Sequence, residues 1–232
     1  TIIRRVAAPG IAALALGLTL SACGAGNESS NGSEGGSDGL SGTLNGAGSS
    51  AQESAMDAWR AGFQKENSGV TINYDPSGSG AGVEKFNAGG IDFAGSDSAL
   101  NDEKGEPAQA DARCKTGKAI NLPMVIGPVA VIYNLPGVDG LRLSPATLAG
   151  IFNSEITKWD APEIKAENPG VSLPSIPIQA FPRSDESGTS DNFTKFLKAT
   201  SDWPYEPGKA WPPEAKGQGA KGSDGITAAV KN

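Results

Sequence analysis

The chain has 232 residues, a formal net charge of −7 and no histidine. This length fits one or two domains with a packed core. The absence of histidine excludes Ser–His and Cys–His nucleophile pairs and histidine metal ligands. Two cysteines are too few for a Cys-rich zinc site, and the acidic charge argues against nucleic-acid binding. We therefore expect neither a metal nor another cofactor.

The first residues have the pattern of an export signal. Arg4 and Arg5 precede the apolar run Val6–Leu20, which is short for a membrane span and typical of a secretory signal peptide. The run ends in Leu-Ser-Ala-Cys23, which resembles a bacterial lipobox, the motif whose cysteine is lipidated. A leader with a cysteine at this place by chance is the alternative. Residues 1–22 are thus predicted to be a lipoprotein signal peptide, with Cys23 as the lipidated residue.

Residues 23–40 are predicted to be a flexible tether behind this anchor. Twelve of the 17 residues 24–40 are Gly, Ser or Asn, a composition that cannot offset the entropy of ordering. An anchor and tether would hold a domain near the outer face of a membrane. Lipidation of Cys23 would leave Cys114 as either a buried free thiol or one half of a disulfide with sequence elsewhere.

The body of the chain alternates predicted strands and helices, which indicates an α/β fold. In its first half, apolar alternation predicts strands at 40–44, 70–74 and 91–94, with helices at 52–63 and from 83 onward. Ser49 or Ser50 is a suitable N-cap for the first helix.

The second half contains two Val- and Ile-rich runs, 122–126 and 129–133. We expect them to be buried strands or a crossover between domains. A helix is predicted at 145–152 and a strand at 176–181. A further helix should follow Ser190, with Phe193, Phe196 and Leu197 on one face.

Three glycine- and serine-rich loops, 46–50, 77–82 and 187–190, each precede a predicted helix. A helix N-terminus offers unpaired N–H groups and partial positive charge, and glycine lets a ligand approach the backbone. A single such loop is explained as well by ordinary N-capping. Three of them, with Arg183 shortly before the last and Asp97 after the end of a strand, predict a site for a small oxyanion.

Enzyme motifs are weak or absent. The pairs Gly117-Lys118 and Gly208-Lys209 are each followed by Ala, so no phosphate-binding Gly-Lys-Ser/Thr motif occurs. The sequence Gly-x-Ser-x-Gly occurs at 35–39, inside the predicted tether rather than after a buried strand. We therefore expect a binding protein and not an enzyme.

Five segments together resemble the substrate-binding lipoproteins of the bacterial high-affinity phosphate ABC transporter. They include Gly-Ala-Gly-Ser-Ser at 46–50, Gly-Ser-Gly-Ala-Gly-Val at 78–83 and Asp-Phe-Ala-Gly-Ser-Asp at 92–97. The others are Ile-Phe-Asn with Thr-Lys-Trp in 151–159 and, most diagnostic, Arg-Ser-Asp-Glu-Ser-Gly-Thr-Ser at 183–190. The resemblance implies a two-lobed periplasmic-binding-protein fold of class II type that closes on one phosphate and then meets a membrane permease.

The resemblance also implies the phosphate ligands. In the family, phosphate is held by hydroxyl and backbone donors, by a guanidinium with an orienting acid, and by a carboxylate that accepts a proton from phosphate. The carboxylate matches Asp97, the guanidinium Arg183 and its orienting acid Asp185. The donors match Ser50, Ala51, Ser79, Ser187, Gly188 and Thr189. Many family members have an aromatic residue where this chain has Ala51. Phosphate near neutral pH carries a proton that Asp97 can accept, whereas sulfate carries none and would meet that carboxylate acceptor to acceptor.

The resemblance further predicts lobe 1 at 41–126 and lobe 2 at 127–232, both incomplete because family members continue well beyond a segment like Gly222–Ile226. Three alternatives stay open. The protein could bind another oxyanion such as sulfate or molybdate, or hydrolyse phosphoesters with Ser187 or Thr189. It could also be a signalling or adhesion lipoprotein without a ligand.

Overall fold

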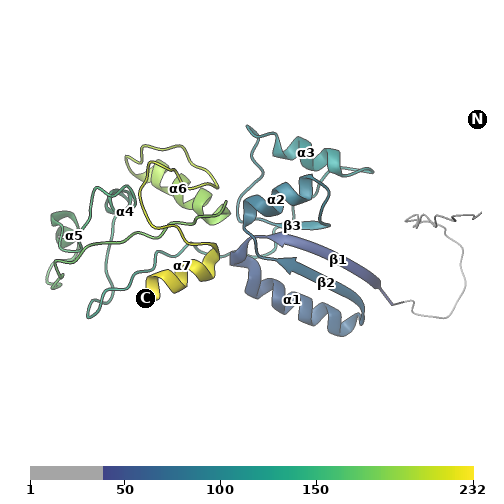
Figure 1. Ribbon diagram of the computed structural model, residues 1–232, viewed down its shortest axis with the longest axis horizontal. Coiled ribbons are helices and arrows are strands. Elements are labelled where there is room, and N and C mark those ends of the chain that lie inside the picture. Colours follow the sequence, from purple (N-terminus) through teal and green to yellow (C-terminus); the bar gives the residue numbers. More distant parts are fainter. Residues whose placement is uncertain (1–38) are drawn as a thin grey trace, which may run out of the picture. The chain divides into compact units, whose positions relative to one another are not determined.

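A computed structural model describes residues 39–232 (Figure 1). The predicted signal peptide 1–22, the lipidated Cys23 and all but the end of the tether 23–40 lie outside the described residues. Among residues 39–232, no helix combines the length and the apolar character needed to span a membrane.

A parallel three-stranded sheet organises the first part of the described chain. Its strands are β1 (Ser41–Gly48), β2 (Gly69–Asp75) and β3 (Phe93–Gly95), in the order β2-β1-β3. The register pairs Ser41 with Gly69 and Gly46 with Phe93. Because the strands are parallel, their three carboxyl ends lie at the same edge of the sheet. The strands predicted at 40–44, 70–74 and 91–94 are thus confirmed.

Two helices pack on this sheet. Helix α1 (Glu53–Glu66) contacts β2, and α2 (Ser79–Asn87) contacts β1 and β3 (Figure 1). A short 3₁₀ turn, η1 (Ser50–Gln52), precedes α1, and its N-cap is Ser49, whose side chain accepts a hydrogen bond from the Ala51 amide at 3.1 Å. The predicted helix 52–63 is thus confirmed, but Ser49 caps the preceding η1 turn, and α1 itself starts after Gln52 without a side-chain cap.

The rest of the chain adds five helices to the described part. They are α3 (Glu106–Arg113), α4 (Pro145–Phe152), α5 (Pro162–Glu167), α6 (Gly188–Thr200) and α7 (Gly222–Lys231). The prediction for α4 is confirmed at both ends. Pro at its first position and a Ser144 side chain that caps the Thr147 amide at 3.2 Å explain where it starts. The sequence analysis did not predict α3, α5 or α7.

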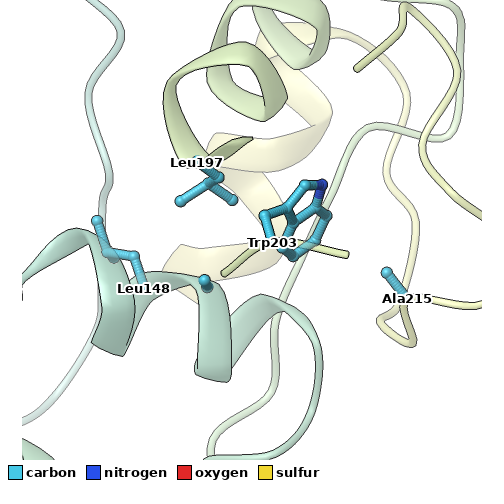
Figure 2. Packing of buried hydrophobic residues seen from close by; sticks show 5 residues of the cluster. Leu148, Leu197, Trp203 and Ala215 are labelled. Carbon is cyan, nitrogen blue, oxygen red and sulfur yellow. The ribbon is translucent and has the colours of Figure 1, made fainter. Parts of the chain in front are cut away.

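The hydrophobic core of the second part lies between α4 and α6. Figure 2 shows Leu148 of α4, Leu197 of α6, Trp203 and Ala215 around one buried centre. Partly buried aromatic side chains surround it, among them Phe152 and Phe193, whose ring centroids are 4.9 Å apart with the rings edge to face. This core holds α6, whose first turn carries predicted ligand residues.

Of the two alternatives predicted for the Val- and Ile-rich runs, the buried strands are wrong, and the crossover between domains stays a prediction. Residues 122–126 and 129–133 form no strand, and most of their apolar side chains are exposed, up to 99% for Ile126. Pro123 and Pro128 lack the N–H that a strand ladder needs, and within residues 39–232 neither run pairs with a sheet strand. Apolar composition alone therefore misled the prediction.

The strand predicted at 176–181 is also wrong. Only a single antiparallel bridge forms, between Lys158 and Pro177, and the ladder does not continue. Pro177 interrupts the run and cannot donate to a ladder.

Two helix boundaries also differ from expectation. Helix α2 begins at Ser79, inside the predicted loop 77–82, and α6 begins at Gly188, inside the loop 187–190. The serine-rich segments thus form the first turns of the helices rather than separate loops. Phe196 is 44% exposed, so it does not share the buried face of Phe193 and Leu197.

Removal of the Leu197 side chain should destabilise the core. Leu197→Ala, in the protein expressed from its complete gene, is expected to lower the free energy of unfolding by about 2–5 kcal/mol, because this side chain is fully buried. Phe196→Ala, on the exposed neighbour, should change it by less than about 0.5 kcal/mol. Chemical denaturation measures both, and equal losses would contradict this core.

Candidate oxyanion site

The first part of the site forms where β1 and β3 end. Ser49 follows β1, is 1% exposed, and donates from Oγ to Asp97 Oδ1 at 2.5 Å. The Ser49 amide donates to the Gly95 carbonyl at 2.9 Å, and the Tyr74 hydroxyl donates to the Ser49 carbonyl at 2.9 Å. Burial and the nearby Asp97 charge raise the pKa of Tyr74 well above its usual range, so it stays a donor. Ser49 and Asp97 are therefore held against each other at the sheet edge.

The second part is the start of α2. Gly78 has φ 100°, a left-handed conformation that favours glycine, and Ser79 behind it is 1% exposed. The Asp97 amide donates to Ser79 Oγ at 3.2 Å. A Cβ on Gly188 would lie 2.8 Å from Ser79 Oγ, so the starts of α2 and α6 approach too closely for any larger residue at 188.

The first turn of α6 supplies the third part. Thr189 Oγ1 donates to Asp97 Oδ2 at 3.2 Å, and Asn192 Nδ2 donates to the Asp97 carbonyl at 2.7 Å. Ser187 caps this helix by accepting from the Ser190 amide at 3.3 Å. Each carboxylate oxygen of Asp97 thus accepts a hydrogen bond from one hydroxyl, that of Ser49 after β1 or that of Thr189 in α6.

Arg183 and Asp185 form a buried ion pair beside these loops. The Arg183 side chain is 7% exposed, and its Nε donates to Asp185 Oδ1 at 2.6 Å while Nη2 donates to Oδ2. Oδ1 also accepts from the Gly222 amide at 3.0 Å. Burial alone would raise the pKa of Asp185, but Arg183 and the Gly222 amide outweigh it and hold that pKa below its usual range. Two of five guanidinium N–H groups are used here, which leaves the opposite edge for an anion.

Four of the nine predicted ligand residues line a single cleft of about 990 Å³. They are Ala51, Asp97, Arg183 and Thr189. The other five are their neighbours. Ser79 and Gly188 contact Asp97 or its amide, and Asp185 pairs with Arg183. Ser187 is the N-cap of α6, and Ser50, next to Ala51 in η1, accepts a hydrogen bond from α7. The described structure therefore brings all nine into one neighbourhood.

Some polar contacts of the site were not predicted from the sequence. Ser49 binds Asp97, and the Ser223 amide of α7 donates to Ser50 Oγ at 3.0 Å. Ser49 stands directly before the predicted ligand Ser50, so its place in the first loop was the available signal. No local signal pointed to Ser223, because the contact spans 173 residues.

Other chemistry is limited in the described part of the chain. Between residues 39 and 232, no three His, Cys, Asp or Glu side chains gather where they could hold a metal ion. Cys114 is a free, partly exposed thiol at the end of α3. What remains is an arrangement of hydroxyls, helix N-termini, the carboxylate of Asp97 and the guanidinium of Arg183 with its paired Asp185.

The Arg183–Asp185 pair predicts acid sensitivity. Because the folded-state pKa of Asp185 is lowered, its stabilisation is present above the unfolded value of about 3.9 and is lost as pH falls through the folded value. The free energy of unfolding should therefore fall as pH is lowered below about 5. Arg183→Met should cost about 3–5 kcal/mol at pH 7, because it leaves a buried carboxylate unpaired, and should flatten the acid slope. Denaturant titrations at several pH values measure this, and identical slopes for both proteins would contradict it.

Comparisons with known proteins agree with this geometry. A family model described as the PBP superfamily domain matches residues 33–232. The chain is 46% identical over 180 residues to phosphate-binding protein PstS 3 of Mycobacterium leprae, an alignment that covers 77% of this chain and 48% of that protein. It is 34% identical over 180 residues to phosphate-binding protein PstS of Haemophilus influenzae, covering 75% and 50%.

A solved structure shows the same fold. It is a putative phosphate ABC transporter substrate-binding protein with bound phosphate from Clostridium perfringens, with a TM-score of 0.58 and 18% identity over 82% of this chain and 67% of that one. The predicted α/β fold of periplasmic-binding-protein type is thus confirmed. The chain spans about half the length of the curated relatives it matches. With its family model matched over most of its length, the chain belongs to the PBP superfamily.

Proposed function

We propose that this protein captures inorganic phosphate outside the cytoplasm and delivers it to the permease of an ABC transporter. The curated relatives are named phosphate-binding proteins, and the solved neighbour from Clostridium perfringens holds phosphate. The nine predicted ligand residues of this chain gather in one neighbourhood. The proposal covers binding and transport, not catalysis.

The observation that carries the proposal is the carboxylate of Asp97 inside a site built from donors. A carboxylate repels an anion unless the anion brings a proton, and phosphate does so near neutral pH. Asp97 accepts one hydroxyl on each oxygen, and a carboxylate has about four acceptor positions, so it can still accept the phosphate proton. Sulfate has no proton, so it would face this carboxylate acceptor to acceptor and with like charge.

The remaining groups account for the negative charge of the ligand. Arg183 can present free N–H groups to phosphate oxygens, because Asp185 holds only one edge of it. The N-terminus of α6, at Gly188 and Thr189, adds backbone donors and the positive end of a 13-residue helix. Ser50, Ser79 and Ser187 supply hydroxyls that can turn toward the ligand.

The anchoring and the division into lobes belong to the same proposal. Residues 1–22 would be the export signal, Cys23 the lipidated residue and 23–40 the tether. Lobe 1 would be 41–126 and lobe 2 127–232, and closure of the lobes on phosphate would present a surface to the permease. The Leu-Ser-Ala-Cys pattern supports the anchor, and the site contacts between α2 and α6 support closure.

Asp97→Asn should abolish the preference for phosphate over sulfate. Calorimetric titration of the protein expressed from its complete gene should give 1:1 phosphate binding that a large excess of sulfate leaves unchanged. In the variant, phosphate affinity should fall about 10–100-fold and sulfate should compete, because the amide no longer repels an unprotonated anion. Asp92→Asn is the matched control, since Asp92 directly precedes the start of the same strand and its side chain accepts only from the exposed Asn45 amide.

Three other results, two from this titration and one from an assay with a chromogenic phosphate ester, would each favour a different function. Displacement of phosphate by sulfate in the unaltered protein would indicate a general oxyanion binder. Turnover of a chromogenic phosphate ester would indicate a hydrolase that uses Ser187 or Thr189. No heat with either anion would favour a signalling or adhesion protein.

Cys23→Ala should release the protein from membranes. Lipidation needs the cysteine thiol, so the variant should move from the membrane fraction to the soluble fraction and lose incorporation of labelled palmitate. Cys114→Ala is the matched control and should leave the distribution unchanged. Membrane retention of Cys23→Ala with undiminished label would contradict the anchor.

A further inference from the structure

A buried ion pair outside the ligand set joins the two predicted lobes. Lys209 Nζ donates to both carboxylate oxygens of Glu106, at 2.9 Å and 2.8 Å. The two side chains are only 5% and 13% exposed, although 103 residues separate them in the sequence. Lys104–Glu186, which also spans the predicted lobes, and Lys85–Asp75, within lobe 1, are both about half exposed, whereas Arg183–Asp185, within lobe 2, is buried as well.

Lys209 is tied to the start of α6. Its carbonyl accepts from the Ser187 amide at 2.9 Å, so the same residue that reaches Glu106 also holds the cap of α6. The preceding Gly208 amide donates to Thr194 Oγ1 at 3.3 Å, and Thr194 is fully buried. The backbone of Lys209 therefore moves with α6 and with the ligand residues at its N-terminus.

Glu106 is tied to the loop that follows Asp97. It is the first residue of α3, and its Oε2 accepts from the Asn101 amide at 2.7 Å. Its own amide donates to the Asn101 carbonyl at 3.0 Å. Burial alone would raise the pKa of Glu106, but Lys209 and the Asn101 amide hold it below its usual range, so the group is a carboxylate at neutral pH.

We infer that Lys209 and Glu106 are positioning residues whose ion pair fixes the start of α6 against the loop after Asp97 and favours the closed arrangement of the lobes over the open one. This inference rests on the proposed function. A buried pair compensates its desolvation only when both partners are in contact, and on opening each group would return to water. The pair should therefore slow phosphate release more than it speeds capture.

The test compares Lys209→Met and Glu106→Gln with the exposed-pair control Lys85→Met, all in the protein expressed from its complete gene. Stopped-flow measurement with inorganic phosphate should give release rates about tenfold or more faster for the first two, with association rates within about threefold. The control should match the unaltered protein. The reversed pair, Glu106→Lys with Lys209→Glu, should recover part of the slow release.

Hydrogen exchange without ligand distinguishes this inference from the proposed function. If the unaltered protein binds no phosphate, the proposed function fails, yet the amide of Ser187 should still exchange faster in Lys209→Met and Glu106→Gln than in Lys85→Met. Unchanged release rates accompanied only by a lower melting temperature would overturn the inference, as would unchanged exchange at Ser187.

Discussion

The site depends on one constraint, a carboxylate held among donors at the meeting point of three chain segments. Asp97 follows β3, accepts from Ser49 after β1, and accepts from Thr189 at the start of α6. Parallel pairing of β1 and β3 places the first two together. Thr189 is 92 residues from Asp97 in the sequence, and its helix α6 is held by a separate core around Leu197.

Close backbone approach is the second requirement, and small residues meet it. Gly78 adopts a left-handed conformation, and Gly188 lies where a side chain would collide with Ser79 and Ser98. Hydroxyls beside these glycines supply donors without bulk. The buried Arg183–Asp185 and Lys209–Glu106 pairs then fix the surrounding loops, since a separated charge in either place would be costly.

Local patterns predicted the sheet, α1, α4 and the neighbourhood of the site, because periodicity, caps and Gly-Ser loops act over a few residues. They failed at 122–126 and 129–133, where apolar composition indicated strands but prolines and the lack of a paired strand in the described chain decide otherwise. Contacts such as Ser50–Ser223 and Lys209–Glu106 span 100 residues or more and leave no local signal. The division into lobes stays a prediction.

The role of Asp97 is tested most directly by the protonation state of bound phosphate, followed by ³¹P nuclear magnetic resonance from about pH 6 to pH 9. We expect a bound resonance that does not shift with pH while free phosphate titrates, because the ligand proton is shared with Asp97. A bound resonance that titrates like free phosphate, or that excess sulfate removes, would contradict the role of Asp97.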